Sequence, residues 1–533
     1  MAVAQAGVRG YLNAVLFDLL GQLRWSFLPP LMVYFAAGCS GLTLIVGTFF
    51  VKEYLDFSAA YIAGLAFWAG LPWALKMPLG HLVDLIWRWK WLLVWLGAGC
   101  VAASVGIMYM VLTFTTYMQM IMPVPSWYII SFLLAPCGLV LQDVVADAMS
   151  IEAVPTHGSQ GRPLPEAEIK NAHVTMQTLG RFALIGGTVA VALLNIAMFS
   201  GIEELDQAGK GKVYANVYMI AFLIPVISIS GVVLAGLQRR MTGANAAAIE
   251  PAEAIEPNWW YFIGGGAFVV LSLIVGLGEV PFGQEIIFAG SMAIVLLLMR
   301  QLIAALEPTQ AKALIGTAVI IFFFRATPLP GDGQTWFQID VLGFDQQFLS
   351  LLSLITSVVT LAVIVLLRPM MANHSIVWIV VVLSILAGLL SLPNIGLYYG
   401  LHNWTSDMTG GFVDARFIAI FDTALESPLG QVAMIPMLAW IAKNAPRELK
   451  ATFFAVMASF TNLAISASTL GTKYLNQVYL VTREVKDPES GAITTAANYS
   501  ELGWLLITVS TLIVVLPLLV VFFVQRTALR STD

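Results

Sequence analysis

The chain has 533 residues, of which 59% are hydrophobic and only 11% are charged. Soluble domains are about half apolar and about a quarter charged, so a chain of this composition could not keep its surface in water. The composition therefore excludes a soluble protein and indicates one that crosses a membrane many times. The formal net charge of −5 is small, and the sequence has no basic tail or patch that would suggest a nucleic-acid partner.

An amphipathic helix over residues 11–27 is the first predicted element. Leucines recur in it at helical spacing, and polar side chains interrupt the apolar surround. This pattern is typical of a helix that lies on the cytoplasmic membrane surface, and Pro29 and Pro30 end it. We assign residues 1–28 to this segment, with a docking site for a partner protein as the second interpretation.

Long apolar runs indicate the membrane crossings, because a helix needs about 20 apolar residues to span the bilayer. The first half contains six such runs: residues 30–51, 59–79, 91–115, 126–149, 174–199 and 214–237. The second half contains six more: residues 312–328, 347–368, 375–394, 412–440, 449–475 and 500–523. An extra pair, 259–277 and 286–305, lies between the halves and brings the predicted total to fourteen transmembrane helices.

These crossings divide the chain into two six-helix bundles and an extra hairpin. The predicted segments are the N-terminal bundle 29–238, the cytoplasmic linker 239–258, the inserted transmembrane hairpin 259–306, the C-terminal bundle 307–525 and the cytoplasmic tail 526–533. Lys and Arg concentrate in the segments that are cytoplasmic if the N-terminus is inside, which supports this topology. The compact loops favour a bacterial inner membrane, with both termini cytoplasmic.

No residue pattern indicates a metal, a cofactor or an enzyme. Cys39, Cys100 and Cys137 each lie in an apolar run, as small packing residues do. The histidines are scattered without ligand spacing, and the sequence has no Gly-x-x-x-x-Gly-Lys loop for ATP. We expect no cofactor, no bound metal and no ATP-driven pumping, and no nucleophile–base pair points to an enzyme.

Two six-helix halves joined by a cytoplasmic linker suggest the major facilitator fold, in which the substrate binds near the midplane between the halves. Three stretches are more specific: Pro72-Trp73 through Asp84, Asp143-Val-Val-Ala-Asp147-Ala, and Phe324-Arg325-Ala-Thr-Pro328. They resemble the second, fourth and seventh helices of the folate–biopterin transporter family. The resemblance covers both halves but not residues 1–28 or 259–305. It implies transport of folate, a related pterin or another small organic anion.

An acidic pair in the fourth crossing is the first site candidate, because a carboxylate below the membrane surface is costly unless it is paired or wetted. Asp143 and Asp147 are four residues apart, so on a helix they share one face. Lys76 and Arg181 are expected at a similar depth in neighbouring helices. Such a network either braces the cytoplasmic side or binds an anionic substrate or a proton.

A second acidic pair, Asp422 and Glu426, has the same spacing in the helix that corresponds to the fourth by pseudo-symmetry. Arg325 and Arg416 are expected at the outer ends of two helices in the same half. Arginines suit a ligand with carboxylates, since a guanidinium group grips a carboxylate bidentately. We interpret these four residues as candidates for substrate or proton binding rather than for bracing.

Two further groups of residues are candidates for gating and for ring stacking. Asp84, Arg88 and Lys90, after the second crossing, could form a charge lock that closes the cytoplasmic side. The aromatic residues that could stack on a flat pteridine ring are Trp68, Trp73, Trp336, Phe337 and Trp404. Most of these are better explained as membrane-interface anchors, but Trp73 lies within a helix beside Lys76 and is a candidate for substrate binding.

Together these features predict a secondary active transporter that works by alternating access and is driven by a proton gradient or by exchange. Its partners would be a small organic anion, protons and the lipid bilayer. The alternative is a non-transporting protein of the facilitator fold that assembles membrane complexes. The N-terminal helix and the hairpin 259–306 would then be surfaces for a partner protein.

Overall fold

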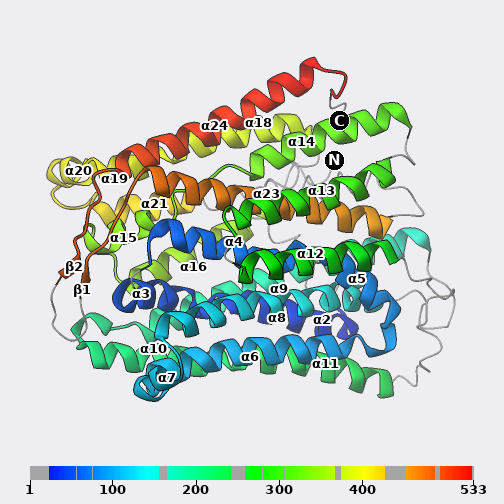
Figure 1. The fold of residues 1–533 in the computed structure, drawn as a ribbon, viewed down its shortest axis with the longest axis horizontal. Helices are drawn as coiled ribbons and strands as arrows, with labels where there is room; N and C mark the ends of the chain where they lie inside the picture. The colour runs from blue at the N-terminus through cyan, green and yellow to red at the C-terminus, as the bar shows by residue number, and fades with distance from the viewer. Residues whose placement is uncertain are drawn as a thin grey trace, which may run out of the picture. The chain divides into compact units, whose positions relative to one another are not determined.

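Helices make up almost all of the described chain (Figure 1). The computed structural model describes residues 23–55, 57–74, 76–154, 165–241, 259–278, 280–303, 307–366, 374–426, 450–486 and 493–530. One antiparallel two-stranded ribbon, β1 (Val485–Lys486) with β2 (Ile493–Thr495), precedes the last helix. The residues separate into two compact units, and neither unit is continuous in sequence.

The first unit comprises Met1–Val46, Leu79–Asn258 and Leu361–Leu366. Its elements are η2 (Trp25–Phe27), α2 (Leu28–Cys39), η3 (Ser40–Thr43), η4 (Trp87–Trp89), α6 (Trp91–Thr113), α7 (Thr115–Ile121), α8 (Val124–Glu152), α9 (Glu166–Met198), η5 (Ile202–Glu204), α10 (Gln207–Ala221) and α11 (Leu223–Met241). Two pairs of these helices pack closely, α2 on α9 and α6 on α8, and glycines make both approaches possible. A Cβ added at Gly38 would lie 1.9 Å from the Leu184 carbonyl oxygen, and one at Gly97 would lie 2.5 Å from the Gly138 carbonyl oxygen.

The second unit comprises Gly47–Pro78, Trp259–Thr360 and Leu367–Asp533. Its elements are α4 (Ala59–Ala74), α12 (Trp259–Leu277), α13 (Gly283–Ile303), α14 (Pro308–Arg325), α15 (Asp332–Asp340), α18 (Ile376–Leu390), α19 (Leu392–Tyr398), α20 (Leu401–Thr409), α21 (Ala415–Glu426), α23 (Lys450–Val478), the ribbon and α24 (Leu502–Arg526). Three helices have residues in both units: α3 (Leu44–Tyr54), α5 (Lys76–Leu85) and α16 (Gln346–Leu366).

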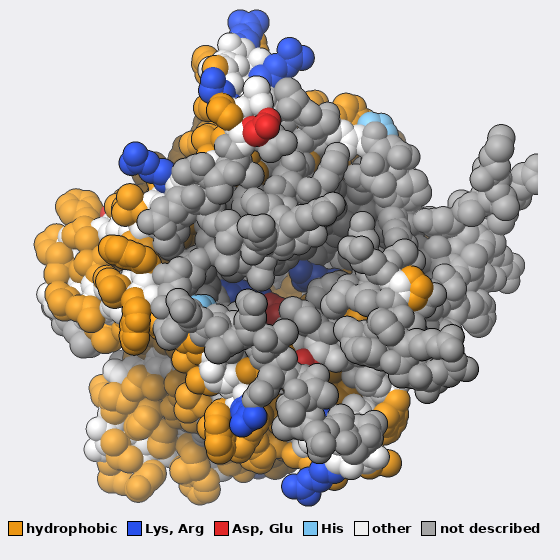
Figure 2. Space-filling view, turned by 90° about the vertical axis from the view of Figure 1, so that its right-hand side faces the viewer, with side chains coloured by type: hydrophobic (Ala, Val, Ile, Leu, Met, Phe, Trp, Pro, Cys, Tyr) orange, Lys and Arg blue, Asp and Glu red, His pale blue; other side chains and the backbone are white. Residues whose placement is uncertain are grey.

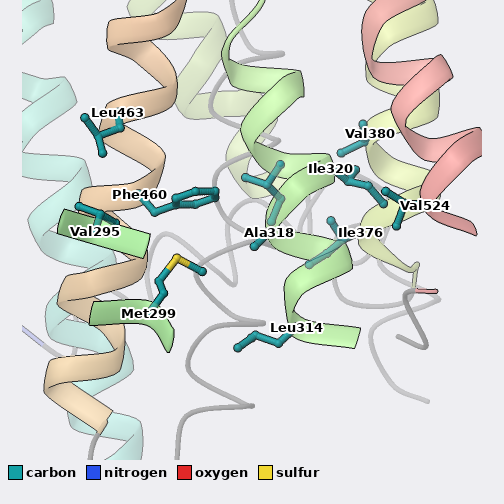
Figure 3. Close-up of a cluster of buried hydrophobic side chains, with 11 residues drawn as sticks. Val295, Met299, Leu314, Ala318, Ile320, Ile376, Val380, Phe460, Leu463 and Val524 are labelled. Atoms are coloured by element: carbon teal, nitrogen blue, oxygen red, sulfur yellow. The ribbon is translucent and has the colours of Figure 1, made fainter. Parts of the chain in front are cut away.

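A buried cluster in the second unit shows how its helices are held together (Figure 3). Leu314, Ala318 and Ile320 of α14 contribute to it, and they are at most 2% exposed. Phe460 comes from α23 and Val524 from α24, so α14 contacts helices that are distant from it in sequence. Lipid is as apolar as these side chains, so close packing rather than transfer out of water stabilises the contacts.

Nine helical stretches in the described ranges are long and apolar enough to cross a membrane. They are Trp25–Lys52, Ala59–Val83, Trp91–Thr113, Val124–Ser150, Thr178–Glu204, Gln207–Met241, Gln346–Val363, Ile376–Tyr398 and Leu502–Arg526. The hairpin helices α12 and α13 contain shorter apolar stretches. Helices occupy every predicted crossing, although the run 412–440 continues beyond the described residues after Glu426. The total of fourteen and the bundle boundaries stay predictions.

The N-terminal segment is described only from residue 23, so most of the predicted amphipathic helix 11–27 lies outside the described residues. Residues Trp25–Phe27 form the short helix η2, and Pro29 and Pro30 lie in the first turn of α2. A proline is well suited to this position, because its missing N–H would have no partner there.

On the face shown in Figure 2, Lys and Arg side chains are exposed at several places, and hydrophobic side chains are exposed between them. In the second unit, Arg300, Lys312 and Arg526 are exposed at the ends of α13, α14 and α24. Basic side chains at helix ends are typical of a membrane protein where its helices leave the bilayer.

Candidate functional site

The acidic pair of the first unit lies on α8, with Asp143 and Asp147 both half-buried. The Tyr34 hydroxyl on α2 donates a hydrogen bond of 2.7 Å to Asp147 Oδ1, and Tyr34 is itself only 8% exposed. The Tyr34 ring lies against Gly180 of α9, where an added Cβ would be 3.0 Å from the ring. Three helices therefore hold one tyrosine against one acid, a partner that the sequence analysis missed.

The two cations predicted to join this pair are placed in different surroundings. Arg181 lies on α9, and its side chain is exposed. Lys76 is the first residue of α5, is half-buried and belongs to the second unit. The predicted network of two acids with two cations stays a prediction.

The predicted charge lock is described in part. Lys90 is 3% exposed, and its Nζ lies 2.7 Å from Glu152 Oε1 and 3.3 Å from the centre of the Trp87 ring. Arg239 of α11 pairs with the second oxygen of Glu152 at 2.8 Å. These contacts connect η4 to the ends of α8 and α11. Arg88 is exposed, the side chain of Asp84 lies outside the described residues, and a gating role for these residues stays a prediction.

Asp422 of the second unit is 4% exposed and lies at the end of a chain of amides. Asn394 Nδ2 on α19 donates to Asp422 Oδ2 at 2.5 Å, and Gln334 Nε2 on α15 donates to Asn394 Oδ1 at 3.0 Å. Each amide is thereby oriented by its neighbour. Sequence reasoning found Asp422 but neither amide. The side chain of Glu426, the last residue of α21, lies outside the described residues.

The predicted arginines of this half have separate surroundings. Arg416 is exposed, and its Nη2 lies 2.9 Å from Asp345 Oδ2 and 3.2 Å from the Gly343 carbonyl oxygen. Its guanidinium group also lies over the Phe348 ring, at 5.1 Å from the ring centre. Arg325 is half-buried at the C-terminal end of α14. No contact between Arg325 and Arg416 is described, so their joint role stays a prediction.

A cavity of about 620 Å³ lies in the second unit, within the range of ~300–1,000 Å³ that holds drug-sized ligands. Helices α4, α13, α15 and α23 and the segment that follows α23 form its walls. The lining residues with chemistry relevant to a ligand are Tyr61, Trp68, Gln284, Trp336, Lys473 and Arg483. Two indole rings and two cations therefore line one cavity.

The two cations of this cavity are held differently. Arg483 is 3% exposed, donates from Nη2 to the Val51 carbonyl oxygen at 2.7 Å, and lies 5.3 Å from the centre of the Trp336 ring. Lys473 Nζ donates to Gln284 Oε1 at 2.9 Å and lies 3.3 Å from Glu285 Oε1. Indole faces bind flat rings, and Lys and Arg bind carboxylates, so the cavity can hold a flat organic anion.

Sequence reasoning found only part of this cavity. Trp68 and Trp336 were named as possible stacking residues, but Arg483 was not named. Lys473 was missed, although it falls inside the predicted crossing 449–475. A cation within an apolar run is the same signal that identified the acids, and it would have identified this residue too. Trp73 lies near the end of α4, where its carbonyl oxygen accepts a bond of 3.5 Å from Asn462. Trp73 does not line the cavity.

Within the described ranges, no three His, Cys, Asp or Glu side chains gather as a metal site would require.

Comparison with known proteins adds the family to this architecture. The sequence matches the BT1 family over residues 37–532. The chain belongs to this family. A folate-biopterin transporter of Synechocystis sp. is 21% identical over 466 residues, which cover 84% of this chain and 74% of that protein. The resemblance to the folate–biopterin transporters is confirmed.

Solved structures with the same fold are also transporters. A POT family transporter in complex with 5-aminolevulinic acid matches with a TM-score of 0.60 and 14% identity, over 93% of this chain and 95% of that chain. The nucleoside transporter NupG matches with a TM-score of 0.52 and 12% identity, over 95% of this chain and 100% of that chain. At such identities the likeness shows the fold alone, and it confirms the predicted facilitator fold. Together with the family, it identifies this BT1 protein as an integral membrane protein and a secondary transporter of a small molecule.

Proposed function

We propose that this BT1 protein carries a folate-like or pterin-like organic anion across the membrane by alternating access, and that the anion binds in the cavity of the second unit. The cavity is the observation that carries the proposal, because it combines Trp68 and Trp336 with Lys473 and Arg483 in about 620 Å³. The name of the relative from Synechocystis sp. supports the substrate class. Transport does not change the substrate chemically, so the proposed function needs no cofactor.

The chemistry of folate matches this lining. Folate joins a flat pteridine ring to a glutamate with two carboxylates. The ring can stack on the indole of Trp68, which is half-buried and lines the cavity. A carboxylate can then pair with the Lys473 ammonium group.

Proton coupling is assigned to Asp147. Its partner Tyr34 carries a hydroxyl, which can donate to an ionised carboxylate or accept from a protonated one. The pair can therefore hold or release a proton without losing its hydrogen bond. Exchange of one anion for another is the competing mode, and it would need no titrating acid.

A bacterial inner membrane with both termini cytoplasmic is the proposed location. The exposed basic residues at the ends of α13, α14 and α24 support this orientation, because Lys and Arg favour the cytoplasmic side.

Uptake of labelled folate into liposomes that contain the purified chain, with and without an imposed pH gradient, tests the proposal. We expect Trp68→Leu and Lys473→Gln to reduce uptake by about tenfold or more, since each removes a contact worth roughly 1.4 kcal/mol or more. The matched controls are Trp504→Leu and Lys312→Gln, both at exposed positions outside the cavity, and they should transport normally. Asp147→Asn should transport without responding to the gradient.

Two outcomes would overturn parts of the proposal. Normal uptake by Trp68→Leu and Lys473→Gln would place the substrate elsewhere. Uptake equal to that of empty liposomes, across a panel of organic anions, would favour the assembly of membrane complexes instead. A partner protein would then be sought at the N-terminal helix or at the hairpin 259–306.

A further inference from the structure

The hairpin helices α12 and α13 pack firmly into the second unit. Ile287 of α13 is fully buried between Phe67 of α4, Phe268 of α12 and Leu470 of α23. Because these contacts surround its first turn, α13 has a fixed position beside the cavity. The polar residues that precede Ile287 are therefore held where the cavity begins.

Gln284 joins three helices at this place. Its Nε2 donates to the Gly64 carbonyl oxygen of α4 at 3.1 Å, and its Oε1 accepts from Lys473 of α23 at 2.9 Å. A Cβ at Gly64 would lie 3.0 Å from Gln284 Nε2, so a glycine keeps this approach open. Gln284 lines the cavity directly, which makes the hairpin part of the proposed binding site.

Glu285 then supplies a negative charge to the same lysine. Its Oε1 lies 3.3 Å from Lys473 Nζ and accepts a hydrogen bond of 2.5 Å from the Tyr474 hydroxyl. The Glu285 side chain is 26% exposed and that of Lys473 is 21% exposed, so solvent reaches both partners. An ion pair that water reaches is weak, whereas a fully buried one is costly to break. The Lys473–Glu285 pair can therefore open when another anion arrives.

We infer that Glu285 is a counter-ion built into the empty site, and that the carboxylate of a bound ligand replaces it on Lys473. The inference rests on the proposed function, because it assigns a specificity-determining residue to the same cavity. A ligand that brings its own negative charge can take the place of Glu285, whereas a neutral pterin of the same shape cannot. The inserted hairpin thereby favours anionic over neutral ligands and sets how tightly they bind.

Equilibrium binding of labelled folate to the purified full-length chain tests this role. Glu285→Gln keeps the shape of the side chain and removes its charge, so it should bind folate about fivefold more tightly than the original chain. Binding of neutral biopterin should be the same in both. Glu307→Gln is the matched control, since Glu307 is exposed at the start of α14 and outside the cavity. Glu285→Asp keeps the charge but shortens the side chain, so its affinity for folate should lie between those of the original chain and Glu285→Gln. This variant replaces Glu285→Gln in the test if Glu285→Gln does not fold.

A second readout needs no folate. Acetic anhydride labels lysine amines, and mass spectrometry measures the labelling of Lys473. Benzoate should protect Lys473, and the benzoate concentration for half protection should fall about fivefold in Glu285→Gln but not in Glu307→Gln. If this concentration does not fall, the counter-ion role is wrong, whatever folate does. An equal gain for folate and for neutral biopterin would also overturn it, because the effect would then come from shape.

The two readouts separate this inference from the proposed function. A shift in benzoate protection without any folate binding would support the counter-ion and contradict the proposed substrate. Normal folate binding in the original chain with no shift in either readout would leave the substrate standing and overturn the counter-ion.

Discussion

Asp147 of the first unit and Asp422 of the second lie on helices that correspond by the predicted pseudo-symmetry, yet their donors differ. Asp147 is half-buried and accepts from the Tyr34 hydroxyl at 2.7 Å. Asp422 is 4% exposed and accepts from the Asn394 amide at 2.5 Å. The oxygen of Asn394 is in turn held by Gln334.

The difference bears on the proposed assignment of proton coupling to Asp147. A hydroxyl can reverse its hydrogen bond, because it is both donor and acceptor. The amide nitrogen of Asn394 can only donate, and the bond from Gln334 prevents the amide from turning its oxygen toward Asp422. The arrangement around Asp422 suits a fixed acceptor that braces α21 against α19, whereas that around Asp147 suits a proton that comes and goes.

The contrast between Asp147 and Asp422 is lost if α2 cannot pack on α9, because α2 carries Tyr34, the hydrogen-bond donor to Asp147. A Cβ at Gly38 would lie 1.9 Å from the Leu184 carbonyl oxygen, which is backbone and cannot rotate away. We expect Gly38→Ala to cost about 3 kcal/mol or more of stability and to lose most of the folded protein. The fraction that elutes as a single species in size-exclusion chromatography after heating measures this loss.

Gly41 supplies the control for this substitution, because nothing lies within 4 Å of an added Cβ there. Gly41→Ala should therefore elute as the original chain does. Equal behaviour of the two variants would show that the close crossing of α2 and α9 is not required.

The two donors themselves can be removed to sharpen the comparison. Asn394→Leu leaves the buried carboxylate of Asp422 without its amide donor, which should cost about 3 kcal/mol. Tyr34→Phe removes a bond to a half-buried acid that water can reach, so it should cost only about 1 kcal/mol. The thermal unfolding midpoints of the purified variants show which of the two substitutions costs more stability. Asn403→Leu, at an exposed position on α20, controls for the change from amide to leucine. A larger loss in Tyr34→Phe would contradict the assignment of Asp422 as the brace.

Apolar runs predicted where the helices lie, because the length of a crossing is set by the bilayer. They did not predict the interruptions. The first crossing contains the 3₁₀ turn η3, where Ser40 and Gly41 favour helix weakly, and the run 375–394 breaks at Ser391, before Pro393. A hydrophobic pattern reports the total length and not such local breaks.

The site was predictable only as single residues. Asp147 and Asp422 stood out as acids in apolar runs, and Lys473 carried the same signal. Their partners did not stand out. Tyr34 precedes Asp147 by 113 positions, and Glu285 precedes Lys473 by 188, so only the packing of helices brings them together. A single sequence does not show which residues that are distant along the chain contact each other in the fold. Neutral donors such as Tyr34 and Asn394 also carry no charge that would draw attention to them.

A pH-dependent effect concerns Asp332, at the start of the same helix α15 that carries Gln334. Asp332 lies outside the membrane crossings, and burial raises its pKa from 3.8 to about 6, even though a helix N-terminus favours the charged form. A raised pKa means that folding favours the protonated acid. This contribution to stability is complete below about pH 4 and is lost as the pH rises through about 6.

The loss amounts to at most about 3 kcal/mol, from the difference between the two pKa values of Asp332, and partial exposure of the side chain reduces it. We expect Asp332→Asn to raise the unfolding midpoint at pH 7.5 and to raise it less at pH 4.5, since only part of the loss has occurred at pH 4.5 and an amide resembles the protonated acid in both conditions. Asp407→Asn, at an exposed position on α20, should shift neither midpoint. If Asp332→Asn instead destabilised the chain at pH 7.5, the charge of Asp332 would support the end of α15.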